Sequence, residues 1–460
     1  MTIENKALKY AYNAHKGQIR KSEPDKPMIL HPINVGKILK NYGFDENVVA
    51  AGYLHDVVED TEKTFDDIKK DFGEDIASLV YGASEPDKSL SWEERKKHTI
   101  ESIKDLDLRH KAVICADKIS NLEDLYYLFG KNGKMDFSHF KRGLESQKWY
   151  YTNVYESLIK NEDKDNPIFL KLNECINNVF NHKENEFLSE IVFNDDKERL
   201  ESLNKLHYKK LELLKLKSLF NQKEPYVIEF TGTPRTGKTT LINNLEDFFK
   251  KGGFKVSVLE EFTTSKKYKK EIYPKLKDQY KNIINTEIPK YVLHELIKEM
   301  IDSNSDIIIV DRSLFDRLIW ADRLYLKNGF TNEEYEKYKT EYIPKIKHLI
   351  DVIIATYTDP ITSIKRDYHA NLALEERHFL NIQNIEEYNT SLNNMEKLGL
   401  EKKININKID TTNRSEETIS IEIANIILDN MRKTYIKRLE KTYKPEWWEV
   451  KEIEVKHKFN

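Results

Sequence analysis

The stretch AGYLHDVVEDT, residues 51–61, concentrates ionisable side chains in an otherwise apolar segment. Placed at helical angles, its polar members share one arc: His55, Asp56, Glu59 and Asp60. The opposite arc carries Leu54, Val57 and Val58 and can pack into a core. We therefore predict one helix, buried on its apolar face, whose polar face can bind a metal ion or act as a general base.

A hydrolytic metal site needs imidazoles and carboxylates that converge from different elements and leave a position for water. The candidates are His31 in ILHP, the adjacent pair His55 and Asp56 in AGYLHDVVEDT, and Asp117 in VICADKISNL. Each lies at the start of a predicted helix or on a helix face whose other side is apolar. The alternative is structural, with His31 capping a helix and Asp117 paired with Lys118.

A second stretch, GTPRTGKTT, fits the pattern G-x-x-x-x-G-K-[ST] and lies between an apolar strand, YVIEF, and a helix, TTLINNLEDFFKK. Its amides and the helix N-terminus would bind the phosphates of ATP, while Lys238 would reach the β- and γ-phosphates and Thr239 would bind Mg²⁺. A glycine-rich turn alone would not explain the Lys-Thr pair. The predicted ATP-binding residues are Gly232, Thr233, Pro234, Arg235, Thr236, Gly237, Lys238, Thr239 and Thr240.

Two kinds of architecture must position these residues. Up to about residue 180, segment after segment has apolar residues three or four apart, separated by Gly, Pro or capping residues, which predicts an all-α domain over residues 1–183. The charged amphipathic segment that follows predicts a helical connector over residues 184–224.

From Tyr226 onward, short β-branched runs alternate with helical segments: YVIEFTG, KVSVLEEF, DIIIVDRS, DVIIATYTD and KININKID. This alternation predicts an α/β domain over residues 225–430, with a parallel sheet covered on both faces. Residues 431–460 form a basic, aromatic tail. The predicted fold class is therefore multidomain, α followed by α/β.

Composition narrows the function classes. The 75 basic and 78 acidic residues nearly balance, which gives no support to bulk attraction to nucleic acid or membranes. No apolar run approaches the roughly 20 residues that span a bilayer, and no signal-peptide core is present at the start. We expect a cytoplasmic protein, and a homo-oligomer is compatible with the sequence. The phosphate-binding pattern, rather than composition, indicates small-molecule nucleotides as partners. Cys115 and Cys175 are predicted to be buried free thiols.

The segments AHKGQIRK, ILHP, AAGYLHDVVEDT and ICADKISNLEDL resemble, in order and spacing, the HD-superfamily hydrolase domains of RelA/SpoT-type alarmone enzymes, over roughly residues 1–150. The resemblance implies a phosphohydrolase of (p)ppGpp-like alarmones in which the four metal-ligand candidates hold one divalent ion, typically Mn²⁺. Glu59 and Asp60 would orient the attacking water. Arg20 and Lys21 would contact the nucleotide, and Asn121 would line its pocket.

The chain departs from that family before the His-Pro step. The family usually reads Ser-Gly-x-Pro-Tyr there, whereas this chain reads SEPDKPMILHP, which lacks the Gly and places Met28 near the usual Tyr. The metal ligands are unaffected, but the loop that would read the base differs.

Residues 225 to 430 resemble thymidylate kinases and deoxynucleoside kinases. Asp311 and Arg312 in DIIIVDRS match their Glu-Arg-Ser or Asp-Arg motif at the end of a strand. A lid that closes over the transferring phosphoryl group is matched by TDPITSIKRDYHANLALEERHFLN, with Lys365, Arg366 and Arg377 as the cationic positions. The alternative for these three is a solvated helix face.

Glu260 and Glu261, which end KVSVLEE, occupy the place of the base that serves the acceptor hydroxyl in deoxynucleoside kinases. A nucleoside acceptor would need that base, whereas a nucleoside monophosphate would not. The sequence leaves both acceptors open.

The leading hypothesis is a bifunctional nucleotide enzyme, a metal-dependent phosphohydrolase joined to an ATP-dependent kinase. A second hypothesis is a regulatory, defence or stress effector in which one domain senses a nucleotide and switches the other. A third is a structural NTPase that uses nucleotide for assembly.

Overall fold

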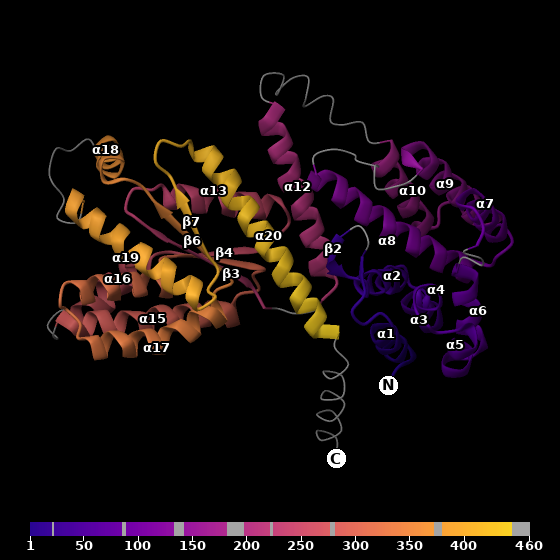
Figure 1. Ribbon diagram of the computed structural model, residues 1–460, viewed down its shortest axis with the longest axis horizontal. Coiled ribbons are helices and arrows are strands. Elements are labelled where there is room, and N and C mark those ends of the chain that lie inside the picture. Colours follow the sequence, from indigo (N-terminus) through magenta and orange to yellow (C-terminus); the bar gives the residue numbers. More distant parts are fainter. Residues whose placement is uncertain are drawn as a thin grey trace, which may run out of the picture. The chain divides into compact units, whose positions relative to one another are not determined.

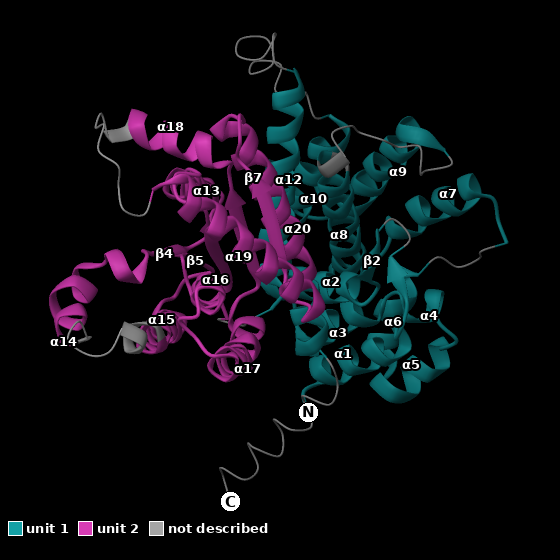
Figure 2. Ribbon diagram, turned by 60° about the vertical axis from the view of Figure 1, so that its left-hand side comes forward, with its two compact units in different colours: residues 1–220, 435–460 teal, residues 221–434 magenta. Residues whose placement is uncertain are grey.

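The computed structural model describes residues 1–20, 23–84, 89–132, 142–181, 197–220, 224–276, 281–371 and 380–443 (Figure 1). The chain divides into two compact units, which Figure 2 colours separately. Unit 1 comprises residues 1–220 and 435–460, and unit 2 comprises residues 221–434. The predicted class, an α domain followed by an α/β domain with a parallel sheet, is confirmed.

Unit 1 is built of helices around the long helix α8, Leu108–Asn132, which packs against α2, α10 and α12. Its other helices are α1 (Ile3–Ala14), α2 (Leu30–Asn41), α3 (Glu46–Leu54), α4 (Val57–Asp60), α5 (Phe65–Phe72), α6 (Glu74–Ala83), α7 (Trp92–Ile103), α9 (Gly143–Leu158), α10 (Pro167–Phe180) and α12 (Lys197–Ser218). α12 lies in the segment expected to be a connector, yet it belongs to unit 1.

Two local features of unit 1 differ from the sequence-based expectation. A small antiparallel hairpin, β1 (Ile19–Arg20) and β2 (Glu23–Pro27), interrupts the predicted run of helices. The single helix predicted through AGYLHDVVEDT is in fact two, because α3 ends at Leu54 and α4 begins at Val57. The helical periodicity of the stretch is real, but His55 and Asp56 occupy the junction.

Unit 2 contains a five-stranded parallel sheet in the order β4-β5-β3-β6-β7. The strands are β3 (Tyr226–Gly232), β4 (Val256–Leu259), β5 (Ile307–Asp311), β6 (Val352–Tyr357) and β7 (Ile406–Asp410), one in each predicted segment. Because all strands run the same way, the loops that follow them meet at one edge of the sheet. The phosphate-binding loop follows β3, and Asp311 ends β5.

Helices flank this sheet on both sides (Figure 1). They are α13 (Lys238–Lys251), the short turns η1 (Phe262–Thr264) and η2 (Tyr268–Ile272), α14 (Tyr273–Leu276), α15 (Lys281–Asp302), α16 (Leu314–Leu326), α17 (Asn332–Leu349), α18 (Pro360–Asn371), α19 (Ile382–Glu401) and α20 (Glu416–Tyr443). α20 continues past residue 430, where a tail was expected to begin, and the boundary between the units falls within it. The tail's remaining residues, 444–460, lie outside the described part.

Two smaller expectations can be compared with the structure. Cys115 and Cys175 are free and buried, as predicted. Within the described ranges, no helix has the length and apolar character to cross a membrane.

Close packing of α2 against α3 depends on glycine. A Cβ atom on Gly36 would lie 2.2 Å from Cε1 of Tyr53, whose side chain is buried. On the facing helix, a Cβ on Gly52 would lie 2.5 Å from Cδ1 of Leu39. These helices carry or immediately precede candidate metal ligands, so their separation fixes the site.

We predict that Gly36→Ala will lower the free energy of unfolding of unit 1 by about 1–3 kcal/mol, because the added methyl group must displace a buried aromatic ring. Thermal unfolding followed by circular dichroism measures the change. The double variant Gly36→Ala/Tyr53→Leu should recover part of the loss, since contacting substitutions are not additive. An unchanged melting temperature for Gly36→Ala would contradict this account of the helix contact.

Candidate functional site

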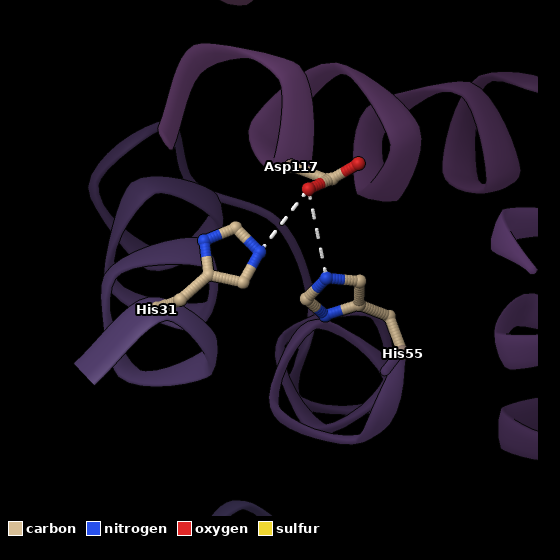
Figure 3. A group of neighbouring side chains, drawn as sticks. All are labelled: His31, His55 and Asp117. Atoms are coloured by element: carbon tan, nitrogen blue, oxygen red, sulfur yellow. Dashed lines mark ion pairs between the residues drawn. The ribbon is translucent and has the colours of Figure 1, made fainter. Parts of the chain in front are cut away.

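Four side chains predicted as metal ligands converge in unit 1. His31 comes from the first turn of α2, His55 and Asp56 from the junction of α3 and α4, and Asp117 from α8. Oδ1 of Asp117 lies 3.2 Å from Nε2 of His31 and 3.7 Å from Nε2 of His55 (Figure 3). Asp56 reaches both imidazoles, with its Oδ2 3.5 Å from Nε2 of His31 and its Oδ1 3.2 Å from Nε2 of His55.

Neighbouring groups orient both imidazoles. Nδ1 of His55 lies 2.9 Å from the carbonyl oxygen of Gly52, one turn earlier, to which it can donate. Nδ1 of His31 lies 2.9 Å from Oγ of Ser120, which also accepts a hydrogen bond from Asn34. With a hydrogen on each Nδ1, both Nε2 atoms are left as lone-pair donors that face the same point, as metal ligation requires.

The electrostatics of this cluster fit a cation at its centre. Nε2 of His55 is buried and has no hydrogen-bond partner in the described protein. Burial disfavours the charged form of His55, but Asp56 and Asp117 raise its pKa to about 9. Burial also lowers the pKa of His31, and Arg20 lowers it further. The two carboxylates thus favour positive charge at Nε2 of His55, which either a proton or a divalent ion would supply.

The predicted pairing of Asp117 with Lys118 is also present, and it leaves the other carboxylate oxygen of Asp117 facing the histidines. Oδ2 of Asp117 accepts from Nζ of Lys118 at 2.7 Å, while Oδ1 faces the histidines. Although burial opposes its ionisation, Lys118 and His31 hold the pKa of Asp117 well below the usual range. His31 makes no side-chain cap at the start of α2, so the capping alternative is wrong.

A pocket of about 630 Å³ opens beside the cluster. The lining includes the predicted substrate and water-directing residues Arg20, Asn121, Glu59 and Asp60, together with Met28 from the departing loop. Arg20 donates to Oδ1 of Asn121 at 3.0 Å, and Asn121 donates to Oδ1 of Asp117 at 2.6 Å. The pocket wall is thus hydrogen-bonded to a candidate metal ligand. Lys21 lies outside the described residues.

Sequence reasoning did not assign a role to Gln18, although it lies inside the motif AHKGQIRK. The Gln18 amide donates to the backbone carbonyl of Asp60 at 2.8 Å, and its Oε1 lies 2.8 Å from Nδ1 of the buried His15. These contacts hold the end of the four-residue helix α4 against the pocket rim. The position of Gln18 within this motif was the feature of the sequence that could have indicated its role.

The phosphate-binding loop of unit 2 has the backbone that its sequence requires. Gly232 has φ 133°, and a Cβ there would lie 1.8 Å from the carbonyl oxygen of Thr356. Gly237 has φ 85° and precedes α13, while Arg235 adopts φ 61°. Lys238 folds back into the loop, donating to the carbonyl oxygens of Gly232 and Thr233 at 3.2 and 2.9 Å.

Among the other predicted ATP-binding residues, some form hydrogen bonds within the protein and others are exposed. Thr233 donates to Oδ1 of Asn389 at 2.6 Å, and Thr236 is buried against Thr356. The carbonyl oxygen of Pro234 accepts from Ser363. Thr239 and Thr240 are exposed, so their hydroxyl groups are accessible to a ligand.

Asp311 and Arg312 lie beside the loop. Nη2 of Arg312 donates to the carbonyl oxygen of Gly232 at 2.9 Å, and its backbone has a left-handed φ of 57°. Oδ1 of Asp311 is buried and has no hydrogen-bond partner among the described residues. Burial raises the pKa of Asp311, whereas Lys238 lowers it. An orphaned carboxylate oxygen next to the loop fits a site for Mg²⁺ coordinated with Thr239.

The two glutamates after β4 differ in position. Glu260 is exposed, whereas Oε2 of Glu261 lies 3.5 Å from Nε of Arg312. The structure therefore brings Glu261, rather than Glu260, toward the residues at the end of β5. Glu229, which sequence reasoning missed, is fully buried and accepts from the backbone amides of Ser313 and Asp316. From its place on β3, Glu229 holds the first residues of α16. An acidic residue inside an apolar strand was the feature of the sequence that could have indicated this role.

The three predicted lid cations, Lys365, Arg366 and Arg377, differ in what the structure shows of their contacts. Arg366 on α18 donates to the carbonyl oxygen of Arg235 at 3.4 Å and to that of Thr411 at 2.6 Å, so it lies against the phosphate-binding loop. Lys365 is exposed, which agrees with a solvated helix face for that residue. Arg377 lies outside the described residues.

Comparisons with known proteins give one family for each unit. Residues 7–134 match the family model described as HD domain, and residues 227–386 match the one described as AAA domain. The guanosine-3′,5′-bis(diphosphate) 3′-pyrophosphohydrolase MESH1 of Drosophila melanogaster is 43% identical over 120 residues, 26% of this chain and 66% of that protein. MESH1 of Xenopus tropicalis is 40% identical over 121 residues, 26% of this chain and 67% of that protein.

The chain thus spans about two thirds of the length of these MESH1 relatives. Among solved structures, a deoxyadenosine kinase from M. mycoides aligns with a TM-score of 0.33 and 20% identity, over 44% of this chain and 98% of that one.

We predict that adding Mn²⁺ to chelator-treated protein will raise the melting temperature of unit 1, since an ion that binds only the folded state stabilises it by about 2.7 kcal/mol at 100 times its Kd. His55→Ala should abolish the shift because it removes one of the two imidazole nitrogens that face Asp56 and Asp117. His294→Ala, an exposed histidine on α15, is the matched control and should retain it. An equal shift in His55→Ala would place the ion elsewhere.

Proposed function

The chain belongs to the HD-domain family through residues 7–134, and on that premise we propose that unit 1 is a Mn²⁺-dependent pyrophosphohydrolase of a (p)ppGpp-like alarmone. The observation that carries the proposal is the convergence of two histidines and two aspartates beside a pocket of nucleotide size. His31, His55, Asp56 and Asp117 would hold the ion. When bound, the ion would act as a Lewis acid and make water a better nucleophile at neutral pH.

The pocket residues would divide the remaining work. Glu59 and Asp60 line the pocket on α4, where they would orient water and accept its proton. The water oxygen would form a bond to the phosphorus next to the 3′ oxygen, and the bond between that phosphorus and the 3′ oxygen would break. Pyrophosphate would leave and the 3′ oxygen would take up a proton. Arg20 and Lys118, both in the lining, would neutralise the departing phosphates.

We predict that the protein with Mn²⁺ releases pyrophosphate from ppGpp, and that Asp56→Ala lowers kcat/KM by about 100-fold or more through loss of a ligand. A coupled pyrophosphate assay with chromatography of the nucleotide product measures this. Asp66→Ala, an exposed aspartate on α5, should leave the rate unchanged. Absence of turnover by folded, Mn²⁺-loaded protein would refute the hydrolase proposal.

For unit 2 we propose ATP-dependent phosphoryl transfer to a (deoxy)nucleoside or a nucleoside monophosphate. The match to the AAA-domain model and the loop geometry support nucleotide binding, with Mg²⁺ at Thr239 and Asp311. Arg366 lies against the loop, where it would neutralise charge on the transferring phosphoryl group. Glu261, next to Arg312, is better placed than Glu260 to accept the proton of an acceptor hydroxyl.

We predict that Lys238→Ala abolishes phosphoryl transfer, because the lysine would bind the β- and γ-phosphates. Mass spectrometry of the protein with Mg²⁺, ATP and a panel of nucleosides and monophosphates detects the product. Lys251→Ala, exposed at the end of the same helix, should be silent. Hydrolysis of ATP without any phosphorylated acceptor would refute the kinase proposal in favour of a structural NTPase.

The same variant separates two enzymes from a switch. If pyrophosphate release from ppGpp persists in Lys238→Ala, the units work independently. If it is lost while the variant remains folded, unit 2 senses a nucleotide that controls unit 1, and the regulatory hypothesis holds.

A further inference from the structure

One face of α8 aligns the metal cluster with a second charged group. Asp117, Asn121 and Asp124 are spaced four and then three residues apart, so they lie on the same side of the helix. Asp124 lines the pocket and is 8% exposed. It is the far end of a hydrogen-bonded row that passes through Arg20 and Asn121 to Asp117.

Asp124 attracts three cations from three different elements. Oδ2 accepts from Arg20 of β1 at 3.2 Å. Oδ1 accepts from Lys26 of β2 at 2.8 Å and from Lys215 of α12 at 3.1 Å. Although burial opposes ionisation, Lys215 and Lys26 hold the pKa of Asp124 well below its usual range. The carboxylate is therefore ionised, and its attraction for Arg20 depends on how well the two lysines neutralise it.

Lys215 also neutralises a second carboxylate, since its Nζ lies 3.1 Å from Oε2 of Glu123. Lys26 is paired in addition with Glu23, at 3.3 Å. Among the described residues, the group thus has three cations and three carboxylates. Removing the charge of Lys215 would leave an excess of negative charge beside a pocket meant for a polyanionic nucleotide.

This charge balance affects Arg20 directly. Asp124 accepts from Nη2 of Arg20, so its negative charge lies in direct contact with the guanidinium group that would bind a substrate phosphate. Both lysines lie on the other oxygen of Asp124 and weaken its hold on Arg20. Without Lys215, Asp124 would attract Arg20 more strongly, and the pocket would repel the substrate more strongly.

We propose that Lys215 of α12 is a positioning residue of the nucleotide pocket, which neutralises Asp124 and Glu123 so that Arg20 stays available to the substrate's phosphates. This inference rests on the proposed hydrolase function of unit 1. Lys215 lies outside residues 7–134, the part that matches the HD-domain model, and α12 was expected only to connect two domains. The pocket of this chain therefore depends on a helix beyond the HD domain itself.

The test is steady-state hydrolysis of ppGpp with Mn²⁺ by the full chain. Lys215→Met should raise KM by about fivefold or more and change kcat by less than about twofold, because the ion pair acts on an anionic substrate rather than on the reacting water. Lys215→Arg should restore the wild-type KM. Lys205→Ala, a lysine on the same helix, is the matched control and should leave both constants unchanged.

A double variant guards against a trivial loss of folding. Asp124→Asn removes the carboxylate through which Lys215 acts on Arg20, so the KM of Asp124→Asn/Lys215→Met should stay within about twofold of that of Asp124→Asn alone. An unchanged KM in Lys215→Met would overturn the inference. So would a fall in kcat, with unchanged KM, that Lys215→Arg does not restore.

The two proposals fail in different ways. If the wild-type protein turns over ppGpp but KM is indifferent to Lys215, only the positioning role is lost. If the folded, Mn²⁺-loaded wild type shows no turnover, the hydrolase function and this inference are both refuted.

Discussion

The buried carboxylate of Asp117 is the constraint on which unit 1 depends. A carboxylate that is taken out of water must be compensated by hydrogen bonds or positive charge. Here Oδ2 accepts from Lys118 of the same helix. Oδ1 accepts from Asn121 and also faces the imidazoles of His31 and His55. Helices α2, α3 and α8 must therefore approach one another closely, which explains the glycines at the α2–α3 contact.

Unit 2 also brings charged side chains together, but it does so at the edge of a parallel sheet instead of between helices. The parallel sheet places the ends of β3, β4 and β5 along one edge, so charged residues from distant segments meet there. Buried Glu229 fixes the start of α16, and Arg312 adopts a left-handed backbone to reach the carbonyl oxygen of Gly232. Both features restrict the backbone next to the phosphate-binding loop. Such restriction is common where a binding site requires a fixed geometry.

The charged side chains around Asp124 show that a pocket can extend beyond its motif. Arg20 and Asn121 belong to segments that resemble the family, whereas Lys215 lies outside residues 7–134, which match the HD-domain model. In our proposal, the balance among these charges decides how strongly the wall of the pocket attracts an anion. The surroundings of the pocket thus involve several elements of unit 1, and Met28 of the departing loop belongs to the same lining.

The sequence by itself determined the fold class, the five strands and the two chemical motifs, because helical and strand periodicity and motif spacing are local properties. It also identified the four candidate metal ligands that converge in unit 1. Only the tertiary structure decided that His55 and Asp56 sit at a helix junction, that Glu261 rather than Glu260 approaches Arg312, and that Lys215 pairs with Asp124, 91 residues away. Such pairings depend on how helices pack and which side chains must neutralise one another when water is excluded, and no spacing along the chain encodes them.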